Sequence, residues 1–186
     1  LHVYTDGAAS KKHGQWMAGC GVWFGEQSPH NVSTRFRGKQ SGNRAELTAV
    51  IISVRKALSM LNRQQKLVVL SDSKYCIDGI ESMQKWSMDG WTRRGQLLRN
   101  ADLWRVMQRA LDAIKQADLQ VEFRHVPAHV VIYGNEKADK LAKAALRRAH
   151  KNAQRTPQDL LDIALDRMAD EIIAACRTAA CRNVHT

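Results

Sequence analysis

The fold is decided by residues 66–72, which read KLVVLSD. This run is apolar without polar alternation, so it predicts a central strand that is covered on both faces. Residues 2–6, HVYTD, alternate apolar and polar side chains and predict a second strand. Both stretches end in an aspartate, Asp72 and Asp6. If the two strands are parallel neighbours, these acids converge at one edge of the sheet.

Periodicity along the rest of the chain completes an α/β pattern. Alternating stretches at 20–24, 32–36 and 119–125 bring the number of predicted strands to five. Apolar residues at three- and four-residue steps predict helices. These are expected between Leu47 and Leu61, from about Lys74 into an irregular segment at 85–96, between Asn100 (as N-cap) and Ile114, and from about Ala138 to Leu146. The sequence therefore predicts a mixed five-stranded sheet flanked by helices.

The chain divides into a body, residues 1–150, and a C-terminal extension, residues 151–186. Residues 151–155 are polar and predict a linker. Thr156-Pro157 is a typical helix start, and an apolar stripe from Leu160 to Ile172 predicts an amphipathic helix. We expect that stripe to pack on the body, with dimerisation or contact with a following domain as alternatives.

Charge is distributed unevenly between these two parts. The chain has 29 Lys and Arg residues against 18 Asp and Glu, a net charge of +11. From Thr156 onward five acids face three arginines, so the extension carries −2 and residues 1–155 carry +13. Excess positive charge attracts a polyanion, most commonly nucleic acid. The body is therefore the expected binding surface.

Location is only loosely constrained. No apolar run is long enough to span a bilayer, so no membrane partner is expected, and no signal-peptide pattern opens the chain. The sequence begins almost inside its first strand, which leaves room for a missing upstream segment. The four cysteines form no CxxC pair and have no histidine at zinc-finger spacing. We expect reduced thiols in an intracellular protein.

Four acids are placed where they can share one site. Asp6 and Asp72 end strands, Glu46 lies near the start of the long helix, and Asp139 lies in the first turns of the last one. Any one alone would be an ordinary surface or helix-capping acid. Together they repel one another and need a counter-charge. Carboxylate oxygens suit Mg²⁺, and two such ions can activate a water and stabilise the departing oxygen, so the set predicts phosphodiester hydrolysis.

Four segments resemble the successive motifs of type 1 ribonuclease H: YTDGAAS (4–10), SGNRAEL (41–47), LSDSKY (70–75) and HVPAHVVIYGNEKADKLA (125–142). The resemblance covers about residues 2–148, and the stretch from His129 to Asp139 is its most specific part. It implies a ribonuclease H-like fold and cleavage of the RNA strand of an RNA–DNA hybrid, leaving 3′-hydroxyl and 5′-phosphate ends. It also implies that Asp6, Glu46, Asp72 and Asp139 bind two Mg²⁺ ions, with Mn²⁺ as an alternative. His129 would assist proton transfer or product release.

The same resemblance implies a set of substrate contacts. Trp86, Trp91, Arg93 and Arg94 resemble the basic protrusion that grips the DNA strand. The alternative is a core tryptophan pair with solvated arginines. Two further groups complete the set: a loop at the minor groove, where 2′-hydroxyls mark the RNA strand, and contacts to the RNA backbone. These are Ser41, Asn43 and Arg44 for the loop, and Gly7, Ser10 and Asn135 for the backbone.

The chain departs from the family pattern without losing a catalytic carboxylate. Gly42 stands where an asparagine is usual, which removes one expected minor-groove contact. Cys76 and Asp78 replace a threonine and an asparagine near the DNA-contacting helix, so phosphate binding there is expected to be weaker. The segment 128–131, AHVV, lacks the glycines that usually flank the histidine.

Two other functions remain open at this stage, an inactive hybrid-binding module and a DNA nuclease or integrase of the same broad fold. The intact carboxylates argue against the first. The segment from His129 to Asp139 argues against the second. The sequence leaves open whether the chain is a free enzyme or part of a larger polypeptide such as a reverse transcriptase.

Overall fold

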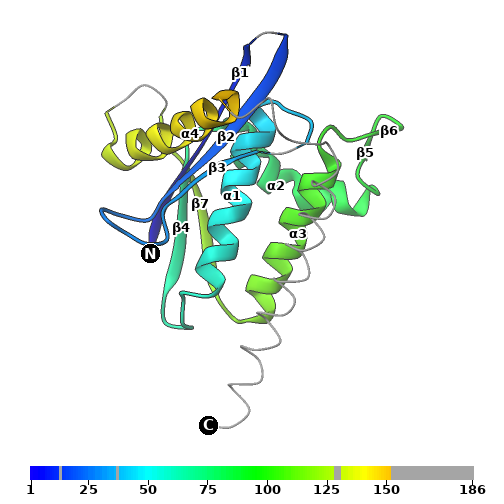
Figure 1. Ribbon diagram of the computed structural model, residues 1–186. Helices are drawn as coiled ribbons and strands as arrows, with labels where there is room; N and C mark the ends of the chain where they lie inside the picture. Colours follow the sequence, from blue (N-terminus) through cyan, green and yellow to red (C-terminus); the bar gives the residue numbers. More distant parts are fainter. Residues whose placement is uncertain (13, 37, 128–130, 152–186) are drawn as a thin grey trace.

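A mixed five-stranded sheet forms the centre of the molecule (Figure 1). The computed structural model describes residues 1–12, 14–36, 38–127 and 131–151. The strands are β1 (His2–Lys12), β2 (Gln15–Trp23), β3 (Val32–Arg35), β4 (Lys66–Ser71) and β7 (Gln120–His125), in the order β3-β2-β1-β4-β7. The first three are antiparallel, whereas β4 pairs in parallel with both β1 and β7. The predicted α/β fold is confirmed.

Helices cover both faces of the sheet. They are α1 (Gly42–Leu58), α2 (Lys74–Met88), α3 (Ala101–Gln116) and α4 (Tyr133–Lys151). Helix α4 crosses one face over β1, β2 and β3, while α1 packs on β1 and β2 from the other face and contacts α3 (Figure 1). Strand β4 therefore lies inside the sheet with apolar residues at Leu67, Val68 and Val69, as its uninterrupted apolar run predicts.

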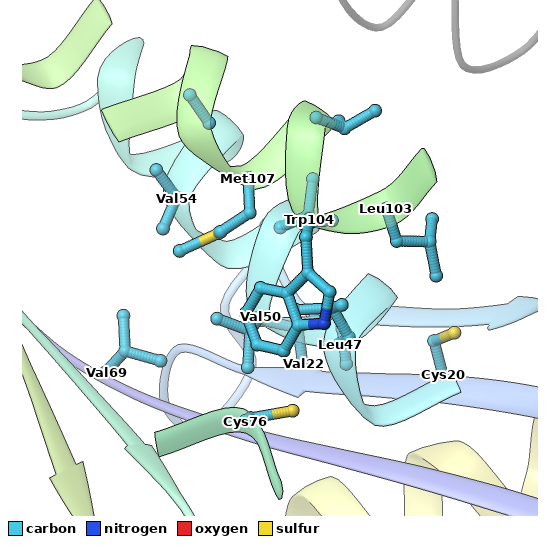
Figure 2. Packing of buried hydrophobic residues seen from close by; sticks show 14 of the residues in the cluster. Cys20, Val22, Leu47, Val50, Val54, Val69, Cys76, Leu103, Trp104 and Met107 are labelled. Atoms are coloured by element: carbon cyan, nitrogen blue, oxygen red, sulfur yellow. The ribbon is translucent and has the colours of Figure 1, made fainter. Parts of the chain in front are cut away.

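The apolar core lies between the sheet, α1 and α3. Trp104 of α3 is completely buried, and its indole ring is surrounded by Leu47, Val50 and Met107 (Figure 2). Trp86 packs on it edge to face, with ring centroids 5.3 Å apart. This packing holds α1 in a fixed position relative to α3.

Two hairpins differ from the sequence prediction. Strands β1 and β2 extend well beyond the predicted 2–6 and 20–24, because their distal residues project from the body where apolar alternation is not required (Figure 1). Residues 85–96 were expected to be irregular, but α2 continues to Met88, and the short hairpin β5 (Thr92–Arg93) and β6 (Gln96–Leu97) follows it. Its turn, Arg94-Gly95, has φ of 54° and 75°, which is typical of a type I′ turn.

Asn100 was predicted to cap α3, and the structure corrects this. It occupies the N-cap position, but its backbone is left-handed and its side chain makes no capping hydrogen bond. The side chain instead accepts from Arg44 and donates to the Tyr75 hydroxyl. A tertiary network has therefore replaced the local cap.

Two predictions fall partly or wholly outside the described residues. The linker and helix expected after residue 151 lie there, as do Cys176 and Cys181. Cys20 and Cys76 are both buried and free. Within the described ranges, no helix combines the length and apolarity needed to cross a membrane.

Candidate active site

Asp6 and Asp72 are brought together by the parallel pairing of β1 and β4. Thr5 of β1 pairs with Ser71 of β4, and the two aspartates are the next residue in each chain segment. Their side chains leave the sheet at the same edge, where β4 ends. The predicted convergence of the two aspartates is confirmed, but only Asp72 follows the end of its strand, whereas Asp6 lies within β1, which continues to Lys12.

A close approach of α1 to β1 adds Glu46. At Gly7, a Cβ atom would lie 2.2 Å from the Glu46 backbone nitrogen, so only glycine allows this contact. The helix begins at its N-cap Ser41, whose hydroxyl accepts from the Arg44 backbone N–H at 3.3 Å. Glu46 is thereby fixed in the second turn of α1, directly beside the residue that follows Asp6.

Asp139 belongs to α4, which packs on the face of the sheet opposite α1. Gly21 pairs with Asp6 across the β1–β2 ladder, and a Cβ atom at Gly21 would lie 2.1 Å from the Ala138 carbonyl oxygen of α4. The next residue of α4 is Asp139. Two glycines thus let one helix on each face lie close to β1 next to the same aspartate.

An open cleft of about 260 Å³ lies at this edge of the sheet. It is lined by Asp6, Asp72, Val131, Asn135, Glu136, Asp139 and Lys143. Three of the four predicted carboxylates therefore face one space, and Glu46 stands at its border, where it accepts a hydrogen bond from the Ser73 hydroxyl.

The electrostatics of the cleft show an unbalanced negative charge. Burial raises the pKa of Asp6 to about 7, and the charges of Asp72, Asp139 and Glu46 add to that rise. Burial likewise raises the pKa of Glu46, together with the charge of Asp72, against the hydrogen bond from Ser73. Carboxylates that hold their protons this strongly need a nearby positive charge to ionise at neutral pH.

Each of the four carboxylates has its own hydrogen-bond donor. The Gly7 N–H donates to Asp6 at 2.7 Å, Asn135 Nδ2 to Asp72 at 3.0 Å, and Lys143 Nζ to Asp139 at 2.8 Å. Ser73 does the same for Glu46. Within the described part of the chain, no three His, Cys, Asp or Glu side chains are gathered tightly enough to hold a metal ion.

The donor set nevertheless fits a divalent cation of the hard type. It supplies carboxylate oxygens, the ligands that Mg²⁺ and Mn²⁺ prefer. Asn135 adds a buried Oδ1 atom without a partner among the described residues. A cation here would relieve the mutual repulsion that raises the Asp6 pKa.

Comparison with known proteins assigns this arrangement to a family. A family model described as RNase H matches residues 1–147. The chain belongs to the ribonuclease H family. The type 1 resemblance is confirmed by relatives named ribonuclease H or H1. Those of Schizosaccharomyces pombe and Homo sapiens are 37% and 34% identical, each over 76% of this chain, and that of Chromobacterium violaceum is 36% identical over 76%.

The relatives differ in length. The chain spans about half of the fission yeast and human proteins, 51% and 48%, and 91% of the bacterial one. Among solved structures, LC9-RNase H1 is 25% identical with a TM-score of 0.59, covering 79% of this chain and 72% of that one. The protease–reverse transcriptase of prototype foamy virus is also 25% identical, with a TM-score of 0.60, covering 78% of this chain and 20% of that one.

The residues predicted to bind the minor groove differ in how far they are exposed to solvent. Asn43 is exposed, and Ser41 is partly buried as the helix cap. Arg44 is buried, and its guanidinium donates to Asp102 at 2.8 Å and lies over the Phe36 ring at 5.5 Å. The Arg44 side chain therefore ties α1 to α3 rather than facing solvent.

The tryptophans of the expected protrusion are likewise less exposed to solvent than its arginines. Trp91 is buried in the core and Trp86 packs on Trp104, whereas Arg93 and Arg94 are exposed on the β5–β6 hairpin. The two indole rings pack in or against the apolar core. The two guanidinium groups are exposed to solvent, where they can contact a phosphate backbone.

The remaining predicted contacts lie on both sides of the cleft. Gly7 and Ser10 lie on β1, where Ser10 Oγ is 2.9 Å from His150 Nε2 of α4. Asn135 lines the cleft itself. His129 lies outside the described residues.

Sequence reasoning missed two residues of this ribonuclease H site. Ser73 directly follows Asp72 and caps α2, and the short polar residue at a helix start was a usable signal. Lys143 lies four residues after Asp139 on α4, the spacing at which opposite charges meet on a helix.

Proposed function

We propose that the chain hydrolyses the RNA strand of RNA–DNA hybrids. The observation that carries this proposal is the partly buried Asp6, whose pKa is raised to about 7 beside three further carboxylates in an otherwise strongly basic body. Such a cluster needs added positive charge, and the net positive charge of the body attracts a polyanion. Membership of the ribonuclease H family selects the hybrid as that polyanion.

We further propose that Asp6, Glu46, Asp72 and Asp139 bind two divalent ions, Mg²⁺ or alternatively Mn²⁺. When bound, such ions supply an activated water and neutralise the charge that develops on the scissile phosphate. Cleavage then leaves 3′-hydroxyl and 5′-phosphate ends. Asn135 and Ser73 act as positioning residues, because each hydrogen bond fixes the orientation of one carboxylate.

Substrate binding is assigned to the two sides of the cleft. Gly7, Ser10 and Asn135 are proposed to contact the RNA strand, and Ser41 and Asn43 the minor groove. Arg93 and Arg94 are proposed to contact the phosphates of the DNA strand. Arg44, Trp86 and Trp91 are proposed to hold the loop and the hairpin in place, in keeping with their burial.

His129 is proposed to assist proton transfer or product release, on the resemblance alone. The buried thiols of Cys20 and Cys76 support a reducing, intracellular location. A place in a larger polypeptide such as a reverse transcriptase is also proposed, because a similar fold occurs within the foamy virus protease–reverse transcriptase.

The test is cleavage of matched hybrid, double-stranded RNA and double-stranded DNA side by side with Mg²⁺. The parent should cut the RNA strand of the hybrid alone. Asp72→Asn should abolish cleavage while leaving hybrid binding nearly intact, and Asp118→Asn, an exposed change after the end of α3, should cut like the parent. Hybrid binding without cutting by the parent would favour the inactive module, and cutting of DNA would favour the DNA nuclease.

A further inference from the structure

The β1–β2 hairpin projects from the body (Figure 1). Aromatic and basic residues lie at its outer end. Trp16 is 51% exposed, although tryptophan normally buries its ring. Lys11 is its cross-strand partner, so their side chains lie on the same face of the hairpin, and Lys12 follows at the end of β1. We define these three residues, Lys11, Lys12 and Trp16, as the hairpin tip.

Two residues of the hairpin tip, Lys11 and Trp16, share a face with the start of α1. Side chains alternate along β1, and Gly7 contacts α1 at Glu46, so Lys11 projects on the α1 side of the sheet. Lys11 and Trp16 therefore lie on the same side as Ser41 and Asn43, where the substrate is proposed to bind, and Lys12 lies on the other face at the end of the strand. At about 3.3 Å per residue, Lys11 and Lys12 are roughly 17–20 Å beyond Asp6 along the strand.

The charge around the tip selects a polyanion. No acid occurs between Gly7 and Gly25, and neither tip lysine has an ion-pair partner among the described residues. A protein partner would require a broader apolar patch than one indole ring. Exposed aromatic rings flanked by cations are typical of surfaces that bind nucleic acid.

The exposed ring favours an unpaired base over a duplex. Bases within a duplex already stack on each other, whereas an unpaired base has a free face for an aromatic side chain. A nucleic acid strand advances about 3.4 Å per nucleotide, so the tip is about five to six nucleotides from the catalytic carboxylates. A strand that leaves the hybrid at this distance would reach the indole ring.

We propose that the hairpin tip binds single-stranded nucleic acid that continues from a hybrid held in the cleft. Trp16 stacks on an unpaired base, and Lys11 and Lys12 bind the flanking phosphates. The inference rests on the proposed function, because the cleft is what places the hybrid. It assigns to the chain a preference for hybrids that end in an unpaired extension.

The test compares binding by fluorescence anisotropy without divalent ions, so that no probe is cut. The probes are a blunt hybrid of about 12 base pairs, the same hybrid with about six unpaired nucleotides added at each of its four ends in turn, and a free single strand. For the parent, at least one extension should tighten binding about fivefold or more. Trp16→Ala should remove that gain, and Trp16→Phe should keep most of it.

The lysines have their own measurement and control. Replacing Lys11 and Lys12 with alanine should lower the salt dependence of free-strand binding by up to about 1.4 units in log–log slope. Replacing Arg63 and Lys115, two exposed cations on the loop after α1 and at the end of α3, removes the same charge and should leave the gain from the extension unchanged. Thermal unfolding should show that all variants remain folded.

Several outcomes would overturn the inference. One is that no extension changes the affinity of the parent. Another is that the affinity of Trp16→Ala for the extended hybrid and for the free strand stays within about twofold of that of the parent. The exposed indole ring would then be assigned to contact with a protein partner instead. A parent that cuts hybrids without any effect of the tip would retain the proposed function alone. A parent that binds single strands through Trp16 but cuts no hybrid would retain the tip alone.

Discussion

Asn135 and Asp72 meet across the catalytic cleft, where Asn135 Nδ2 donates to Asp72 Oδ2 at 3.0 Å. Asn135 is only 8% exposed, and its Oδ1 atom has no partner within the described residues. The amide therefore fixes the orientation of one carboxylate and leaves a second oxygen available in the same cleft. This contact joins the end of β4 to the first turn of α4.

Asn135→Ala should lower divalent-cation affinity, cleavage or both by about 10- to 100-fold, because the Asp72 carboxylate loses the partner that orients it. Calorimetric titration with Mn²⁺ and the rate of hybrid cleavage measure the two effects. Asn62→Ala, in the exposed loop after α1, is the matched control. Unchanged cation affinity together with an unchanged rate would show that Asp72 does not depend on Asn135.

The stability of the cation-free protein should fall as the pH rises from about 4 to about 7. Asp6 has a pKa of about 7 when folded against 3.8 for the free side chain, so in this window the folded protein holds a proton that the unfolded chain has released. Asp6→Asn should remove most of this fall, leaving the part due to Glu46, and should stabilise the protein above pH 7 by at most about 4 kcal/mol. Urea unfolding across the pH range in a chelator measures the effect.

Divalent cations should reverse that trend, since they bind the deprotonated carboxylates and add most stability above about pH 7. A difference between the parent and Asp6→Asn that stays constant from pH 4 to pH 8 would contradict the raised pKa of Asp6.

Lys143→Ala should increase divalent-cation affinity about two- to fivefold. The Lys143 ammonium lies 2.8 Å from the Asp139 carboxylate and lines the same cleft as Asp6, so it competes with a bound cation for that carboxylate. Both side chains are partly exposed, which keeps the effect small. Lys140→Ala, an exposed change on the same helix, is the control, and weaker cation binding by Lys143→Ala would refute the competition.

Gly42→Asn should tighten hybrid binding severalfold by restoring the asparagine that the family usually has there, with a net gain of roughly 0.5–1.5 kcal/mol. The alternative, that the loop needs glycine for its conformation, is not supported by the structure. Gly42 has an ordinary backbone, and a Cβ atom there would meet nothing within 4 Å. Weaker hybrid binding, measured by anisotropy without divalent ions, would exclude a favourable contact at this position.

Arg93→Ala combined with Arg94→Ala should flatten the salt dependence of hybrid affinity by up to about two units, because both guanidinium groups are exposed on the β5–β6 hairpin. Replacing Arg63 and Lys115 removes equal charge elsewhere and serves as the control. An unchanged slope would mean that the hairpin does not contact the phosphate backbone.

Local patterns explain most of what could be predicted. The five strands follow from periodicity, and Asp6 and Asp72 were found because each directly follows a predicted strand segment, and those two segments pair in parallel. Pattern rules failed at the ends of β1 and β2, since side chains there need not alternate once the hairpin leaves the body. They also failed at Asn100, where a tertiary hydrogen bond to Tyr75 replaced the local cap.

The sequence by itself determined the fold class and the family and predicted the four carboxylates, because strand periodicity and motif spacing are properties of the chain. Only the tertiary structure decided which group donates a hydrogen bond to each carboxylate. It also decided which basic or aromatic side chains are exposed to solvent. Arg44 is buried against Asp102, whereas Trp16 is exposed. Those outcomes depend on which faces of α1, α3 and the β1–β2 hairpin meet, and that geometry is set by packing between residues far apart in the chain.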